Sequence, residues 1–131
     1  LHGTEDAQRV AEVRDRFGVK VMKVIRISEP SDLERVPAFE PVADLLMFDA
    51  KPPKDATRPG GNAVAFDWRI LAGKSWKQPW LLSGGLDAGN VRQAVEITGA
   101  KFVDVASGVE NAMGVKDPSL IRAFLEEVRA I

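Results

Sequence analysis

Apolar runs and segments with helical spacing alternate along this chain. Short runs rich in Val, Ile, Leu and Phe are typical of buried strands, and each is followed by a segment whose apolar residues recur at helical spacing. The predicted strands are Val19–Ile27, Ala43–Phe48, Trp80–Ser83 and Phe102–Ala106. Strands that alternate with helices are typical of repeated βα units. The pattern therefore predicts an α/β fold with a parallel sheet.

Capping residues mark where the intervening helices begin and end. Short polar side chains at the predicted starts can accept hydrogen bonds from free backbone N–H groups, and Gly or Pro is expected at the ends. The predicted N-caps are Thr4, Ser31, Asp67, Asn90 and Asp117, and the predicted stops are Gly18, Pro37, Gly73 and Gly99. The helix after Asp117 has the clearest pattern, with Pro118 at its first position. A long loop, Ala50–Phe66, lies between the second and third strands.

Composition narrows the class of protein. The chain has 131 residues, 45% of them hydrophobic, with a net charge of -1 and no cysteine, which fits one globular domain over residues 1–131. This charge argues against nucleic-acid binding. The longest apolar run, Leu45–Phe48, is far shorter than the roughly 20 residues of a membrane span, and Leu1–Asp6 shows no secretory signal. Without cysteine and with His2 as the only histidine, a metal site or a Ser-His-Asp hydrolase is not expected.

Residues that directly follow the predicted strands are the candidates for chemistry. Ligands of parallel α/β proteins bind at the carboxyl ends of the strands. Gly84 and Gly85 follow one strand, and Ser107 and Gly108 follow the next. Each pair alone could simply form a strand-to-helix turn. Two such turns on neighbouring strands favour a phosphate site built from backbone N–H groups.

Two aspartates lie at or within predicted strands. Asp49 follows the apolar run 45–48, a setting that raises a carboxyl pKa and suits a general acid. A helix cap or a turn-stabilising role explains it equally well from the residues alone. Asp104 lies between two valines, where a pairing with lysine is favoured over lining a site. Lys51 and Lys54 are expected to be solvated, and the three tryptophans are expected to be packing residues.

Several motifs together resemble those of phosphoribosylanthranilate isomerase. They are Leu1-His2-Gly3, Phe48-Asp49 with the Pro/Lys-rich loop and Gly60-Gly61 before Phe66-Asp67-Trp68, Ser83-Gly84-Gly85-Leu86 with Asn90-Val91, Val103-Asp104-Val105-Ala106-Ser107-Gly108-Val109-Glu110, and Lys116-Asp117. The resemblance implies a parallel (βα)8 TIM barrel. It also implies the Amadori rearrangement of tryptophan biosynthesis, on a small-molecule substrate, in the cytoplasm, without metal or organic cofactor.

The resemblance also implies roles for single residues. Asp49 matches the family's general acid, and His2 matches a histidine that faces the site. Gly84, Gly85, Ser107 and Gly108 match the phosphate site, and Asp104 matches an acidic residue near the anthranilate end. Asn62-Ala63 stands where the family usually has Thr-Gly, and Ala106 stands where Ser is commoner.

The chain matches only part of that barrel. The family's base is a cysteine on the first strand, and an arginine on the second strand binds the substrate carboxylate. The resemblance begins at the end of the fourth strand, so the chain is expected to cover roughly the C-terminal half, to be inactive alone, and to act as a monomer or homodimer when full length. A complete barrel has about 250 residues. The cut sheet is expected to leave Val19–Ile27 and Phe102–Ala106 as unpaired edges.

Two other functions are compatible with this sequence. One is a non-catalytic half-barrel that binds sugar phosphates or assembles with a complementary chain. The other is a sister barrel such as indole-glycerol-phosphate synthase, which relies on catalytic lysines and a glutamate at strand ends. Asp49 at the end of the second strand of this chain fits that enzyme poorly.

Overall fold

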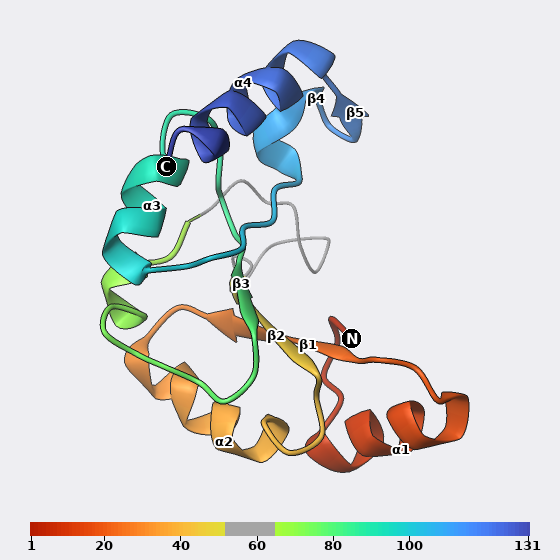
Figure 1. Cartoon of the computed structure of the whole chain (residues 1–131). Coiled ribbons are helices and arrows are strands. Elements are labelled where there is room, and N and C mark those ends of the chain that lie inside the picture. Colours follow the sequence, from red (N-terminus) through yellow and green to blue (C-terminus); the bar gives the residue numbers. More distant parts are fainter. Residues whose placement is uncertain (52–64) are drawn as a thin grey trace.

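The computed structural model describes residues 1–51 and 65–131, and it is an α/β structure. The elements follow one another as α1 (Ala7–Phe17), β1 (Met22–Ile27), η1 (Pro30–Arg35), α2 (Val36–Phe39), β2 (Leu45–Ala50), η2 (Trp68–Ile70), β3 (Trp80–Leu82), α3 (Val91–Thr98), η3 (Ser107–Val109), β4 (Glu110–Ala112), β5 (Val115–Lys116) and α4 (Pro118–Arg129), where η marks a 3-10 helix. Strands and helices lie along an open arc, with α1, α2 and α3 on its outer side (Figure 1). Lys54, Gly60-Gly61 and Asn62-Ala63 lie outside the described residues.

The parallel sheet predicted from the sequence is present. Its strands are in the order β1-β2-β3, and β2 is parallel to both neighbours. The register pairs Ile25 with Phe48 and Arg26 with Asp49. Since paired residues of neighbouring strands point to the same face, Arg26 and Asp49 share one face, and Ile25 and Phe48 share the other.

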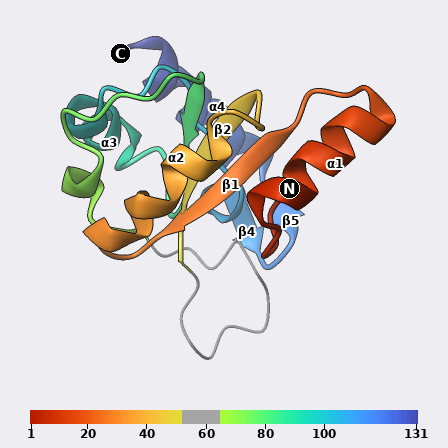
Figure 2. The same cartoon turned by 90° about the horizontal axis from the view of Figure 1, so that it is seen from below.

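The hydrophobic core lies between the sheet and the helices outside it. Ile25, Leu46, Phe48 and Leu82 are each at most 1% exposed on the outer face of the sheet, where helical residues such as Val10 also belong to the core. The ring of Phe48 lies 4.3 Å from that of Trp76 and 5.5 Å from that of Trp80. Figure 2 shows α1, α2 and α3 around the strands from below. The opposite face carries Arg26 and Asp49, which are described below.

Several element boundaries differ from the predictions. Helix α1 is capped by Asp6, whose side chain accepts from Arg9 N, and not by Thr4. Pro37 does not end a helix, because it occupies the first turn of α2, where its missing N–H costs no hydrogen bond. Strand β2 is shifted toward the C-terminus and includes Asp49. Asn90 is at the predicted N-cap of α3, but its side chain makes no capping bond there.

The C-terminal part also departs from the sequence pattern. The predicted strand Phe102–Ala106 is reduced to one parallel bridge, between Val103 and Leu82. The hairpin β4-β5 was not predicted. Helix α4 confirms its prediction: Asp117 caps it by accepting from the backbone N–H groups of Ser119 and Leu120.

Leu1 contacts the outer edge of β1, which corrects the expectation that this edge is wholly unpaired. The backbone nitrogen of Leu1 donates to Met22 O at 2.7 Å, and Val24 N donates to Leu1 O at 3.0 Å. This is the hydrogen-bonding pattern of a parallel strand. Apolar residues are exposed in the C-terminal part: Phe102 is 56% exposed, and Leu120, Ile121 and Leu125 on α4 are 37–44% exposed.

Candidate active site

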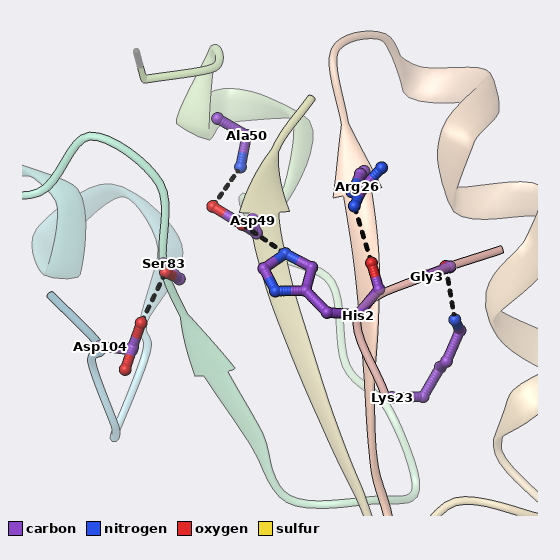
Figure 3. A network of polar contacts seen from close by, with 8 residues as sticks. All are labelled: His2, Gly3, Lys23, Arg26, Asp49, Ala50, Ser83 and Asp104. Atoms are coloured by element: carbon purple, nitrogen blue, oxygen red, sulfur yellow. Dashed lines mark hydrogen bonds and ion pairs between the residues drawn. The ribbon is translucent and has the colours of Figure 1, made fainter. Parts of the chain in front are cut away.

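Asp49 is the central residue of the candidate site, near the carboxyl end of the middle strand, β2. Its side chain is on the face of the sheet opposite Phe48, and the residue is only 7% exposed. One carboxylate oxygen, Oδ1, accepts from the backbone N–H of Ala50 at 2.8 Å. The other, Oδ2, lies 3.1 Å from Nε2 of His2 (Figure 3). Because Asp49 lies within a strand, the alternative that it caps a helix is wrong.

Burial raises the pKa of Asp49 above its ordinary value. The attraction of His2 and the hydrogen bond from Ala50 oppose this rise, and the negative charge of Asp104 adds to it. The net shift is upward, as the apolar residues 45–48 predict. A carboxyl that keeps its proton to higher pH can donate it to a substrate, which is what general acid catalysis requires.

His2 reaches Asp49 from a distant part of the sequence. The backbone of Leu1 runs along β1, and this places His2 beside the end of the sheet. The side chain of His2 is 43% exposed, whereas that of Asp49 is 10% exposed. The imidazole is therefore much more exposed to solvent than the carboxyl that it contacts.

Asp104 lies next to the strand end on the other side of Asp49. Its Oδ2 accepts from the hydroxyl of Ser83 at 2.9 Å, and its backbone N–H donates to Leu82 O at 2.8 Å. Within the described residues its side-chain partner is Ser83, so the favoured pairing with a lysine is wrong. The sequence pattern places Ser83 at the end of a strand and gives no signal of this hydrogen bond.

Gly84 is in contact with the candidate acid. It has a φ of +89°, and a Cβ atom there would lie 2.4 Å from Ala50 N and 2.9 Å from Asp49 Oδ1. Any side chain at this position would collide with the site. The backbone N–H groups of Gly84 and Gly85 make no hydrogen bond to another described residue. These groups can therefore bind an anion beside the acid.

The second glycine turn packs against the loop that follows β3. A Cβ atom at Gly108 would lie 1.8 Å from Leu86 O, so only glycine allows this approach. Ser107 and Gly108 form the short 3-10 helix η3. The two glycine turns are thus neighbours, as their order in the sequence predicts.

Two cations on β1 bind the segment that carries His2, and the sequence pattern predicts no chemistry for either. Arg26 Nη2 donates to His2 O at 2.7 Å, and Lys23 Nζ donates to Gly3 O at 3.0 Å (Figure 3). The signal that could have identified Lys23 and Arg26 is the presence of two charged residues in a strand rich in Val and Ile. Beside Arg26 is a hollow of about 300 Å³ lined by Gly3, Thr4, Val24, Arg26, Arg35 and Lys51. Lys51 is half-exposed, as predicted, and pairs with Asp32 at 3.1 Å.

The described residues hold neither a metal cluster nor a membrane helix. No group of three or more His, Asp or Glu side chains in residues 1–51 and 65–131 is placed to bind a metal ion. In the same residues, no helix is both long and apolar enough to cross a membrane.

A parallel βα sheet with a buried acid and paired glycine turns at its strand ends is typical of the α/β proteins that bind ligands at the carboxyl ends of their strands. The sequence model of one such family, "N-(5'phosphoribosyl)anthranilate (PRA) isomerase", matches residues 1–127. The chain therefore belongs to the phosphoribosylanthranilate isomerase family. This match favours the isomerase over the indole-glycerol-phosphate synthase considered from the sequence.

Individual relatives agree with this assignment. The chain is 53% identical over 132 residues to N-(5'-phosphoribosyl)anthranilate isomerase of Ruegeria sp. (strain TM1040), and 54% identical over 130 residues to that of Paracoccus denitrificans. These alignments cover 100% and 99% of this chain but 61% and 60% of the relatives. The chain thus spans about three fifths of the length of the curated relatives that it matches.

Solved structures show the same fold. The phosphoribosyl anthranilate isomerase of Thermotoga maritima superimposes with a TM-score of 0.81 at 28% identity, covering 98% of this chain and 60% of that one. A structure of the isomerase in complex with reduced 1-(o-carboxyphenylamino)-1-deoxyribulose 5-phosphate has a TM-score of 0.72 at 25% identity, covering 98% of this chain and 57% of that one.

Proposed function

We propose that these residues form the acid and phosphate side of a phosphoribosylanthranilate isomerase active site, within roughly the C-terminal half of a (βα)8 barrel. The reaction is the conversion of N-(5-phosphoribosyl)anthranilate to 1-(2-carboxyphenylamino)-1-deoxyribulose 5-phosphate. The observation that carries the proposal is the buried Asp49 carboxyl, in contact with both His2 and the Gly84 turn. A barrel that only binds sugar phosphates has no need of a buried proton donor.

Asp49 is the general acid that opens the sugar ring. Oδ1 is occupied by the Ala50 N–H, which leaves Oδ2 as the oxygen that carries the proton. Transfer of this proton to the furanose ring oxygen breaks the bond from that oxygen to the anomeric carbon, and the lone pair of the anthranilate nitrogen forms a C=N bond to that carbon. The products of this step are a protonated imine with a free sugar hydroxyl and an ionised Asp49. The Ala50 N–H and a His2 tautomer with its proton on Nε2 then stabilise the carboxylate. General acid catalysis of this kind contributes about 10²- to 10⁴-fold.

The substrate phosphate binds at the paired glycine turns. The free N–H groups of Gly84 and Gly85 and the adjacent η3 turn of Ser107 and Gly108 offer the donors. Since Gly84 also touches Asp49, a phosphate held there places the sugar close to the acid. We assign Asp104 to the substrate-binding side, where Ser83 holds its carboxylate.

The remaining catalytic groups belong to the part of the barrel that the relatives contain in addition to the region matched by residues 1–131. That part supplies the cysteine base, which removes a proton from carbon 2 of the opened sugar, and the arginine that binds the anthranilate carboxylate. It also covers the exposed apolar residues of α4. The full-length enzyme acts in the cytoplasm, as a monomer or homodimer, without metal or organic cofactor. Residues 1–131 alone do not support turnover.

The test is an isomerase assay on the full-length protein, with substrate generated in situ. We expect Asp49→Asn to lower kcat by about 10²- to 10⁴-fold. Asp15→Asn is the matched control, because the Asp15 side chain is 74% exposed on α1 and remote from the sheet end, so kcat stays at the wild-type value. Wild-type kcat in Asp49→Asn would refute the assignment of the acid. Turnover by residues 1–131 alone would refute the half-barrel proposal.

A further inference from the structure

Residues 1–3, which include His2, are held to β1 by backbone and side-chain hydrogen bonds. Two backbone bonds join Leu1 to Met22 and Val24. Beyond Leu1, side chains continue the attachment: Arg26 binds the carbonyl of His2 at 2.7 Å, and Lys23 binds that of Gly3 at 3.0 Å. Two cations of one strand thus hold two consecutive carbonyls.

Arg26 and Lys23 hold this segment from opposite faces of the strand. Side chains alternate along a strand, so residues 23 and 26 point to different faces. Lys23 is on the outer face, 1% exposed, where its ammonium also binds Glu5 at 2.8 Å and lies 5.4 Å from the ring centre of Phe39. Arg26 shares the inner face with Asp49, its register neighbour.

Burying a lysine is costly unless its charge finds partners. An apolar residue at position 23 would pack in the core on the outer face of the sheet, where Ile25 and Ile27 are at most 1% exposed. Lys23 instead directs its charge to Gly3 and Glu5, and Arg26 directs its own to His2. Charge-assisted bonds of this kind are about twice as strong as neutral ones. Both cations therefore serve the segment 1–5.

The position of the His2 ring depends on this attachment. The ring is 43% exposed, and its polar contact among the described residues is with Asp49, 3.1 Å away. A half-exposed ring has little packing to hold it in one place. Its distance from Asp49 is therefore set by its own backbone, which Arg26 holds.

We propose that Arg26 is a positioning residue of the isomerase reaction: by holding the His2 carbonyl it keeps the imidazole against the Asp49 carboxyl, and Lys23 supports the same segment from behind. The inference rests on the proposed function, because the contact between His2 and Asp49 matters for turnover only if Asp49 is the acid. Among the described residues the hydrogen-bond partner of Arg26 is the carbonyl of His2, so Arg26 acts through His2.

A double-mutant cycle in the full-length protein tests this role. We expect Arg26→Gln to lower kcat by about 10- to 100-fold with little change in KM, because the His2 imidazole is misplaced relative to Asp49 while the phosphate site is intact. In a His2→Asn background the same substitution should cause no further loss. An equal loss in both backgrounds would overturn the proposal. Arg26→Lys, which keeps a cationic donor, should recover most of kcat, and a loss as large as that of Arg26→Gln would overturn the proposal. If Arg26→Gln fails to fold, Arg26→Met, which also removes the donors, takes its place in the cycle.

Arg35→Gln is the matched control. Arg35 lines the same hollow as Arg26 and carries the same charge, but it lies over the ring of Phe39 at 5.8 Å and makes no hydrogen bond to residues 1–3. We expect wild-type kcat for Arg35→Gln. A loss equal to that of Arg26→Gln would show that the charge of the hollow matters rather than the bond to His2, and would overturn the proposal.

A measurement independent of activity separates this inference from the proposed function. The imidazole resonances of His2, assigned by their loss in His2→Asn, should change in Asp49→Asn when Arg26 is present. With Arg26→Gln they should no longer respond to Asp49→Asn. An inactive wild-type protein with this coupling would refute the isomerase proposal alone. Resonances that respond to Asp49→Asn equally with and without Arg26 would refute the positioning role.

Discussion

Replacing Gly84 by alanine tests how tightly the phosphate turn is built against the acid. The new methyl group would lie 2.4 Å from Ala50 N and 2.9 Å from Asp49 Oδ1, so strand β2 and the turn have to move apart. The backbone adds a second cost, because Gly84 has a φ of +89°. The steric cost and the backbone cost act at the same position. The same substitution at Gly99 allows the two costs to be separated.

The expected magnitudes follow from this geometry. A positive φ costs a residue with a Cβ atom about 1–2 kcal/mol, and overpacking costs about 1–3 kcal/mol. Gly84→Ala should therefore lower the free energy of unfolding by about 2–5 kcal/mol. Gly99 has a φ of +70° with nothing within 4 Å of its Cβ position, so Gly99→Ala bears the backbone cost alone.

The assay compares both variants of the full-length protein by urea unfolding and by kcat/KM. Gly84→Ala should unfold at a lower urea concentration than Gly99→Ala, and its kcat/KM should fall by about 100-fold, since a displacement of about 1 Å at a reacting group can have that effect. Gly99→Ala should keep wild-type kcat/KM. Equal unfolding midpoints and equal kcat/KM for the two variants would refute the claim that the Gly84 turn touches the acid.

Two further predictions concern stability. Burial raises the pKa of Asp49, so its contribution to stability is complete below its unfolded-state pKa and is lost as pH rises through the folded-state pKa. Asp49→Asn should thus stabilise the protein more at about pH 8 than at about pH 4, and a pH-independent difference in melting temperature would contradict this. Phe48→Ala should cost about 3–5 kcal/mol in urea unfolding, because Phe48 is fully buried beside Trp76 and Trp80; a loss below about 1 kcal/mol would contradict it.

Local pattern was sufficient for much of the fold. The apolar run 45–48 predicts strand β2, and Asp117 predicts the start of α4. Both signals depend only on residues that are adjacent in sequence. Pro37 was misinterpreted because a proline that ends one helix can equally begin another. Phe102–Ala106 has the composition of a strand, but only Val103 forms a bridge, since pairing requires a partner strand in register as well as propensity.

Some features of the candidate site were predictable from the sequence, and others were not. Its acid and its glycine turns were predictable because residues at the carboxyl ends of neighbouring parallel strands converge. The partners of that acid were not predictable from local pattern. His2 is 47 positions from Asp49, and Arg26 is 24 positions from the carbonyl that it binds.

The sequence by itself determined the approximate positions of β1, β2, β3, α1, α3 and α4, and the acid and glycines that stand at the strand ends. It did so because hydrophobic periodicity, capping and glycine turns are properties of a few consecutive residues. Only the tertiary structure decided that Gly84 touches Asp49, that Ser83 rather than a lysine holds Asp104, and that Arg26 secures His2. These contacts depend on the register and the neighbours of the strands, which bring together groups that no local pattern connects.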